Sequence, residues 1–123
     1  MKKLITILLI SLCISSLVAC TGGSYLLVKG GFSSSDSRLE GQYSTFTGDY
    51  YRKVTLTEGD SLTFSFLQNT IEGSLTATVN DKNKNVVFDI TDGAAFKVEK
   101  TGQYRITVHG EKHNGNFIIT WDK

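Results

Sequence analysis

From Gly48 onward, apolar and polar residues alternate with a period of two along several short stretches. Threonine occupies many of the polar positions, and pairs such as Gly59-Asp60 and Asp92-Gly93 separate the stretches. Alternation of this kind is typical of antiparallel sheets that have one buried and one wet face. The pattern therefore predicts an all-β antiparallel sandwich of seven or eight strands. The predicted core is Val54, Leu56, Leu62, Phe64, Phe66, Leu75, Val79, Phe88, Ile90, Phe96, Tyr104, Ile106, Val108, Phe117, Ile119 and Trp121.

Before Gly48 the alternation is less regular. Residues 25–28 (Tyr-Leu-Leu-Val) predict a first strand. Residues 30–37, rich in glycine and serine, predict a loop, or a longer tether if the first strand is not docked. Near the end of the chain, Gly110 and Asn114-Gly115 predict a hairpin loop around His109 and His113.

The first 20 residues have a different pattern. Lys2 and Lys3 precede a mostly apolar run from Leu4 to about Leu12, and small residues follow near Ala19. This order is typical of a secretory signal peptide, which would form a short N-terminal helix. The run is shorter than the roughly 20 residues that a membrane-spanning helix needs, although an uncleaved anchor is the alternative.

Leu17-Val18-Ala19-Cys20 resembles the lipobox of bacterial lipoproteins. The resemblance implies cleavage before Cys20 and attachment of diacylglycerol and further acyl chains such as palmitate to that residue. Together with the predicted strands, it divides the chain into a signal peptide at 1–19, a lipidated tether at 20–24 and a β-sandwich domain at 25–123 with its core at 46–121. More than one acyl chain is needed for stable anchoring.

A lipoprotein of this kind lies on the outer side of the cytoplasmic membrane or in the periplasm. Thr21 lacks the aspartate that favours inner-membrane retention in the family, so the outer membrane is an alternative in a Gram-negative host. Cys13 would leave with the signal, and no free thiol or disulfide would remain. Loss of Lys2 and Lys3 leaves 11 basic against 12 acidic residues, which gives no electrostatic reason to expect a nucleic-acid partner.

A second resemblance covers roughly residues 46–121. The segments 48–66, 73–81, 99–110 and 115–121, with Gly-x-Tyr-x-Ile-x-Val at 102–108, are similar to small jelly-roll modules of the pre-peptidase C-terminal type. The likeness implies a jelly-roll-like sandwich with an accessory or binding role.

Candidate catalytic and metal sites are weak. Residues 81–85 (Asp-Lys-Asn-Lys-Asn) begin like a calcium loop but lack the required glycine, so a polar hairpin turn is favoured and a structural calcium ion stays unassigned. His109 and His113 lack further zinc ligands. Ser61 lacks the surroundings of a nucleophile elbow. We therefore expect no cofactor and no enzymatic activity.

Aromatic residues are concentrated in the N-terminal part of the domain. We predict that Tyr43, Phe46, Tyr50 and Tyr51 form an exposed surface for a cell-wall glycan or an envelope protein, because exposed aromatics stack on sugars and anchor partners. The alternative is that these rings cover one end of the sandwich. The sequence thus predicts a monomeric, non-catalytic binding or adaptor module. A structural accessory of another envelope protein and, with less support, a hydrolase are the alternatives.

Overall fold

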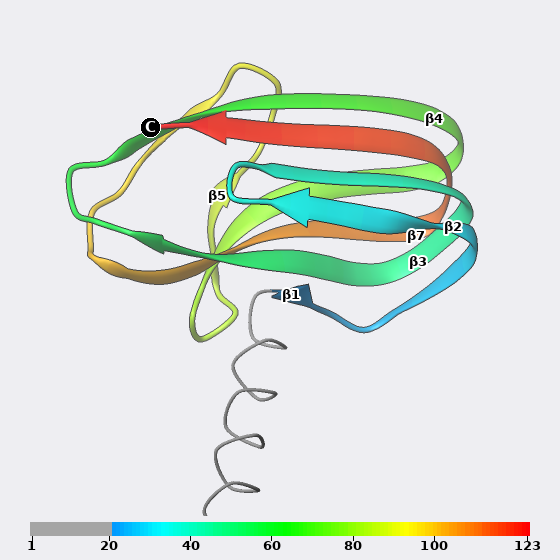
Figure 1. Cartoon of the computed structure of the whole chain (residues 1–123), viewed down its shortest axis with the longest axis horizontal. Helices are drawn as coiled ribbons and strands as arrows, with labels where there is room; N and C mark the ends of the chain where they lie inside the picture. Colours follow the sequence, from blue (N-terminus) through cyan, green and yellow to red (C-terminus); the bar gives the residue numbers. More distant parts are fainter. Residues whose placement is uncertain (1–20) are drawn as a thin grey trace, which may run out of the picture.

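The computed structural model describes residues 21–123; the predicted signal peptide, the predicted lipobox and Cys20 lie outside the described residues. The described part is built from strands and contains no helix, and so no helix that could cross a membrane. The strands are β1 (Thr21–Gly22), β2 (Tyr25–Ser35), β3 (Arg38–Leu56), β4 (Ser61–Asp81), β5 (Val86–Asp89), β6 (Ala95–Lys97) and β7 (Gly102–Asp122), shown in Figure 1. The predicted all-β fold and its number of strands are confirmed.

Three long strands dominate the sheet. β3 has 19 residues, and β4 and β7 have 21 each. β7 pairs with β3 on one side and with β4 on the other, in both cases antiparallel, so the last strand of the chain is central. Register shifts interrupt the pairing between Tyr43 and Gly48 on β3 and between Thr70 and Ser74 on β4. Shifts of this kind bend a strand and increase its twist.

The bend divides the sheet into two layers that pack face to face. Layer 1 consists of β2, residues 38–48 of β3, 61–70 of β4, 113–122 of β7, and β6. Layer 2 consists of β1, residues 48–56 of β3, 74–81 of β4, 102–111 of β7, and β5. Rings meet across the layers: Phe32 stacks on Tyr50 with centroids 4.1 Å apart, and Phe64 lies 6.0 Å from Phe88. The architecture is therefore a sandwich in which three strands belong to both layers.

The core fills the space between the layers. The predicted core residues are buried, except that Val54, Phe66 and Phe88 are half-buried and pack against the cluster. The cluster also contains residues that the predicted core does not include, namely Leu39, Tyr43, Phe46, Tyr50, Ala77 and Val98.

The glycine- and serine-rich segment at 30–37 is not a loop, contrary to expectation. β2 continues through it to Ser35, and only Asp36 and Ser37 turn the chain into β3. Gly30 has φ 109°, and a side chain there would overlap the Gln42 carbonyl oxygen. Gly30 therefore allows two paired strands to approach closely and is not part of a flexible connection.

The predicted hairpin loop around His109–Gly115 is also wrong. These residues lie inside β7, where it passes through the bend. A Cβ atom at Gly110 would lie 2.6 Å from Cδ2 of Phe46, so this glycine allows β7 to cross close over a buried ring. The glycine thus serves packing at a bend and does not reverse the chain.

The segment predicted as a tether is docked over residues 21–24. Thr21 and Gly22 pair with Arg52 and Tyr51 of β3, and the Asp49 amide donates a hydrogen bond to the Ser24 carbonyl. The chain is therefore bound to the sandwich from the first residue that the structure describes.

Candidate functional site

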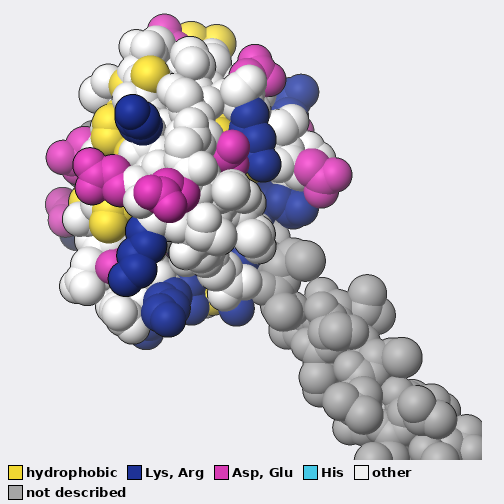
Figure 2. Space-filling model, turned by 90° about the vertical axis from the view of Figure 1, so that its left-hand side faces the viewer, with side chains coloured by type: hydrophobic (Ala, Val, Ile, Leu, Met, Phe, Trp, Pro, Cys, Tyr) yellow, Lys and Arg dark blue, Asp and Glu magenta, His cyan; other side chains and the backbone are white. Residues whose placement is uncertain are grey.

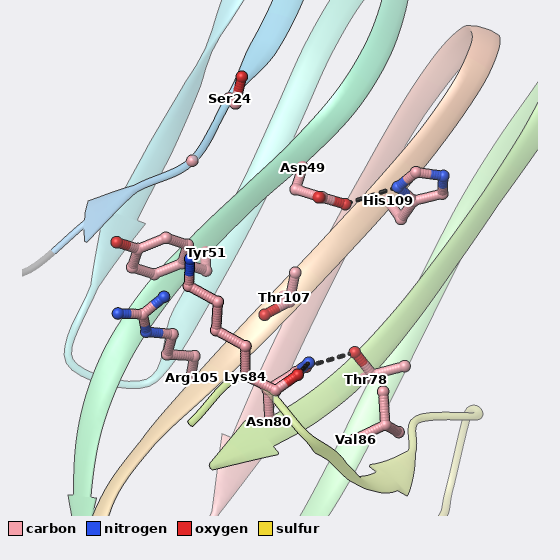
Figure 3. Close-up of a pocket in the computed structure, with 11 residues that line it drawn as sticks. Ser24, Asp49, Tyr51, Thr78, Asn80, Lys84, Val86, Arg105, Thr107 and His109 are labelled. Atoms are coloured by element: carbon pink, nitrogen blue, oxygen red, sulfur yellow. Dashed lines mark hydrogen bonds and ion pairs between the residues drawn. The ribbon is translucent and has the colours of Figure 1, made fainter. Parts of the chain in front are cut away.

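A groove of about 620 Å³, here called the outer groove, lies on the solvent side of layer 2. This volume is within the range of about 300–1,000 Å³ that is typical of small-ligand sites. Figure 3 shows side chains from β3, β7 and β4 along the groove, with β1 at one flank and β5 at the other. The lining residues are Gly23, Ser24, Asp49, Tyr51, Thr78, Asn80, Lys84, Val86, Arg105, Thr107 and His109.

The strand register places these polar side chains in rows. Thr107 of β7 is paired with Tyr51 of β3 and with Thr78 of β4. Two residues earlier on β7, Arg105 also faces outward, and it lies between its register partners Lys53 of β3 and Asn80 of β4. Alternate residues on the same strands point into the core, so the period-two pattern that builds the interior also builds the groove floor.

One end of the groove holds a histidine between two carboxylates. Nδ1 of His109 lies 2.5 Å from an Asp49 carboxylate oxygen, and its Nε2 lies 3.6 Å from Glu111. The hydrogen bond to Asp49 is the main reason why the pKa of His109 is raised, and Glu111 adds to the effect. Both ring nitrogens therefore face acceptors, which suits the charged imidazolium.

This cluster is not a catalytic triad. Within residues 21–123, neither ring nitrogen of His109 makes a hydrogen bond to a serine or threonine hydroxyl. A base that activates a nucleophile needs a free nitrogen within hydrogen-bond reach of that nucleophile. The arrangement of His109 favours an ion-paired structural or binding role.

The other end of the groove holds two cations. The Arg105 guanidinium carbon lies 4.4 Å from the centroid of the Tyr51 ring, a cation–π contact. Figure 3 shows Lys84 extending from the β4–β5 turn toward Tyr51 and Arg105. Among the side chains that the structure describes, neither Arg105 nor Lys84 is in an ion pair. These two cations are available to an anionic ligand.

Tyr51 also contacts the N-terminal segment. A Cβ atom at Gly22 would lie 2.5 Å from the Tyr51 hydroxyl oxygen and 2.8 Å from Cζ, so the ring lies directly against this glycine. One side chain thus links β1 to the Arg105 end of the groove.

The other aromatic residues of the predicted binding surface are in the core. Tyr43, Phe46 and Tyr50 are 7%, 0% and 9% exposed, so the prediction of an exposed aromatic surface is wrong for these three. The irregular pairing between Tyr43 and Phe46 turns both rings inward although they are three residues apart. Of the predicted set only Tyr51 reaches the surface.

His113 is fully buried and belongs to the interior of the bend. Its Nδ1 is 2.6 Å from the Tyr43 hydroxyl oxygen and its Nε2 is 2.8 Å from the Thr70 hydroxyl oxygen. Burial lowers the pKa of His113 and raises that of Tyr43. His109 faces solvent on the other side of β7, so the two histidines do not share a site. In the described part of the chain no three His, Cys, Asp or Glu side chains could hold a metal ion together.

The segment at 81–85 is a hairpin turn between β4 and β5, as favoured from the sequence. Oδ1 of Asp81 accepts hydrogen bonds from the backbone amides of Asn83 and Asn85, both at 2.9 Å. The Asn85 amide is the main cause of the lowered pKa of Asp81. This turn places Lys84, which has φ 68°, at the rim of the outer groove.

Sequence reasoning missed Arg105, Lys84, Thr107 and the Asp49–His109 pair as site residues. Each is polar and lies at a strand position or turn that the alternation leaves exposed, but so are many others. The feature that distinguishes them is the register of β7 with β3 and β4, which pairs Asp49 with His109, 60 positions apart, and Asn80 with Arg105, 25 positions apart.

No protein-family model matches the sequence, and no curated protein matches it. Among solved structures, the chain aligns with PliG of Aeromonas hydrophila, a periplasmic inhibitor of g-type lysozyme, at a TM-score of 0.45 and 11% identity. That alignment covers 86% of this chain and 90% of PliG. A protein of unknown function (DUF1255) from Acidithiobacillus ferrooxidans aligns at a TM-score of 0.26 and 15% identity, over 76% of this chain and 88% of that one. Similarity at this level does not assign a function to the chain.

Proposed function

We propose that this protein is a bacterial lipoprotein, anchored through lipid on Cys20, whose β-sandwich is a non-catalytic binding module with the outer groove as its ligand site. The observation that carries the proposal is the pair Arg105 and Lys84. Both cations point to the same part of a groove of ligand size, and neither is in an ion pair with a described residue.

The ligand that fits this end of the groove carries an anionic group. A guanidinium presents planar, paired N–H donors that match carboxylate and phosphate oxygens, and a lysine adds a mobile positive charge. Stacking on Tyr51 fixes the Arg105 side chain before a ligand arrives, which reduces the entropy cost of binding. The Thr78 and Thr107 hydroxyls on the floor can donate or accept further hydrogen bonds.

The geometry supports binding more than catalysis. The one histidine that faces the groove has a carboxylate at each nitrogen. Both ring nitrogens are therefore directed at carboxylates, and neither is directed at a serine or threonine hydroxyl of the described residues, as a base that activates such a nucleophile would be.

The anchor is supported by the order of basic, apolar and lipobox residues at the N-terminus. It is also compatible with the fold, because β1 begins one residue after Cys20 at an edge of the sheet. A lipid on Cys20 would therefore not disturb the core.

Binding is tested by NMR with the lipidated protein and a panel of envelope fragments that bear carboxylate, phosphate or no charge. We expect anionic fragments to shift the amides of residues 105–109 and 78–84, and Arg105→Gln or Lys84→Gln to weaken binding. Lys97→Gln, which removes an exposed charge on β6, is the matched control. Equal shifts from neutral fragments, or equal affinity of the Arg105→Gln variant, would contradict the proposal.

Anchoring has a separate test. Cys20→Ala should abolish acyl labelling and membrane retention, whereas Ser24→Ala should leave both intact. Retention of the acyl label by the Cys20→Ala protein would show that the lipobox assignment is wrong.

The edge of β2 favours a second role as an accessory of another envelope protein. In the described chain β2 pairs only with β3, and Leu26 and Val28 on it are 77% and 54% exposed. An apolar edge strand is a surface on which another strand can pair. Site-specific photocrosslinking from position 26 in cells tests this role, and capture of no partner from that position would exclude a stable complex there.

A further inference from the structure

The outer groove lies beside the point where the lipid would be attached. Thr21 follows Cys20 directly and is already paired with Arg52, and Gly22 is paired with Tyr51 of the groove. Consecutive Cα atoms are only about 3.8 Å apart, so the lipidated residue lies within one peptide unit of β1.

Residues 21–24, which connect the proposed anchor to the groove, are held closely against β3. Gly22 lies against the Tyr51 ring, and Gly23, with φ 135°, is so close to β3 that a side chain there would overlap the Asp49 carbonyl oxygen. The Ser24 carbonyl accepts the Asp49 amide at 2.9 Å. Residues 21–24 therefore cannot act as a flexible spacer without breaking these contacts. A lipid on Cys20 would hold layer 2 at the level of the headgroups.

The groove end nearest to β1 is basic. Lys53 and Arg105 are register partners there, and Lys82 and Lys84 lie in the β4–β5 turn. On the face drawn in Figure 2, Lys and Arg side chains predominate over Asp and Glu on the lower part of the domain, while both kinds lie on the upper part.

The acidic side chains near this face make other contacts. Asp49 and Glu111 contact His109, and Asp89 lies on β5 opposite Thr78. Asp81 begins the β4–β5 turn beside Lys82, but its carboxylate accepts the backbone amides of Asn83 and Asn85 and forms no ion pair with a described lysine or arginine. The cations of the basic end are therefore not neutralised by ion pairs with described residues, and they face the side on which the anchor begins.

We propose that the basic end of the outer groove binds the phosphate of an anionic phospholipid in the membrane that holds Cys20, with Arg105 and Lys84 as the contacting side chains. This inference rests on the proposed lipid anchor. The acyl chains on Cys20 keep the domain on the surface, and the headgroup contact orients it with layer 2 against the bilayer. A single contact of this kind is weak alone, and anchoring raises the effective concentration of the headgroups.

The mature lipidated chain offers a clean probe. Cys13 leaves with the signal and Cys20 is a thioether, so one introduced cysteine is the only thiol. Val86→Cys places an environment-sensitive dye at the exposed rim of the groove, and Thr63→Cys places it on exposed layer 1 as the control. Each labelled protein is reconstituted in vesicles of phosphatidylcholine with a rising fraction of phosphatidylglycerol.

We expect the emission of the dye at position 86 to move to shorter wavelength as the phosphatidylglycerol fraction rises, and the dye at position 63 to be unaffected. A basic side chain near an anionic surface contributes about 1 kcal/mol, which is about fivefold in binding. Arg105→Gln and Lys84→Gln should each raise, by about fivefold, the phosphatidylglycerol fraction at which half of the emission shift is reached. Lys97→Gln should leave it unchanged. If Arg105→Gln lowers the melting temperature, its effect on binding could come from a less stable fold. Lys84→Gln then decides, because Lys84 is exposed in a turn.

Two results would overturn the inference while leaving the anchor intact. One is a protein that stays on the vesicles but whose dye at position 86 does not respond to phosphatidylglycerol, or responds equally in the Lys84→Gln variant. The other is saturation of the groove by free glycerol phosphate without any response to the anionic vesicles, which would assign the site to a soluble ligand. Failure of the proposed anchor is distinct, because the protein would then carry no acyl label and would not remain on neutral vesicles.

Discussion

The Tyr43 hydroxyl oxygen lies 2.6 Å from Nδ1 of His113, and both side chains are buried where β3 and β7 pass through the bend. The Thr70 hydroxyl occupies the other ring nitrogen at 2.8 Å. A neutral imidazole has one donor and one acceptor, and a hydroxyl can be either, so both nitrogens are satisfied without a charge. The three side chains tie β3, β4 and β7 together at the point where all three strands leave one layer for the other.

Removal of the Tyr43 hydroxyl should destabilise the fold. Tyr43→Phe keeps the ring but leaves Nδ1 of His113 buried without a partner, which costs about 1–3 kcal/mol of unfolding free energy. Urea unfolding followed by the fluorescence of Trp121, which is 5% exposed, measures the change. Tyr51→Phe is the control, since no hydrogen bond of that hydroxyl to a described residue is present; equal stability of the Tyr43→Phe and Tyr51→Phe proteins would contradict the role of His113.

The two histidines should titrate on opposite sides of the ordinary histidine pKa of about 6.5. Burial lowers the pKa of His113, so below pH ~6.5 the unfolded chain takes up a proton there before the native state does. Its contribution to stability is thus complete above pH ~6.5 and is lost as the pH falls through the native pKa. The raised pKa of His109 acts in the opposite direction, and its stabilisation is lost as the pH rises through the native value.

NMR titration of the two imidazole rings checks these directions. His109→Gln removes one set of signals and assigns the other, and it should leave the acid-side loss of stability in place. A midpoint for His113 at or above 6.5 would show that the ring is not held neutral by burial.

The fit of Gly22 against Tyr51 predicts a local effect of substitution. Gly22→Ala should loosen β1, because the new methyl group would lie 2.5 Å from the Tyr51 hydroxyl oxygen and 2.8 Å from its Cζ. Hydrogen exchange at the amides of residues 21–24 and 49–52 should accelerate while the melting temperature changes little, since β1 has only two residues. Gly102→Ala is the matched control, because a Cβ atom there meets nothing within 4 Å. Unchanged exchange in Gly22→Ala would mean that the segment does not depend on this contact.

The docking of β2 is tested by a pair of substitutions on that strand. Phe32 stacks on Tyr50 and packs edge-on against Phe46 with centroids 5.0 Å apart, so Phe32→Ala should cost about 2–4 kcal/mol. Leu26→Ala, at a side chain 77% exposed, should change stability by less than about 0.5 kcal/mol. Equal effects of the two substitutions, measured by urea unfolding, would mean that residues 25–35 behave as a loop.

The parts of the fold that sequence could predict are those set by local alternation. Leu62 and Phe64, or Ile106 and Val108, are two residues apart and share a face wherever a strand forms, so their burial follows from the pattern alone. The glycine-rich stretches were misassigned because glycine is common both in loops and where backbones approach closely, and only pairing distinguishes the two. Gly110 illustrates this, because the side chain that leaves no room for a Cβ atom there is Phe46, 64 residues away in the chain.

The candidate site depended on the same long-range information. The aromatic residues at 43, 46 and 50 lie inside because bulges shift the phase of the alternation on β3, and such a shift cannot be inferred from a run of tyrosines. Arg105 and Lys84 become neighbours of Tyr51 only through the pairing of β3, β7 and β4 and through the turn that follows β4. The lipobox, in contrast, is a motif of consecutive residues, so predicting it required no knowledge of the fold.

The central place of β7 has a consequence for how the chain reaches its folded state. Residues 102–122 form β7, with which both β3 and β4 pair. The register partner of Arg38, at the start of β3, is Thr120, near the end of β7. A nascent chain that lacks these residues has β2, β3 and β4 but nothing to join the last two. The sandwich therefore cannot close until the last segment has emerged, and contacts of this sequence separation form slowly. Until residues 102–122 have been made, the edges of β3 and β4 that pair with β7 have no partner strand, although the β2–β3 hairpin can already form.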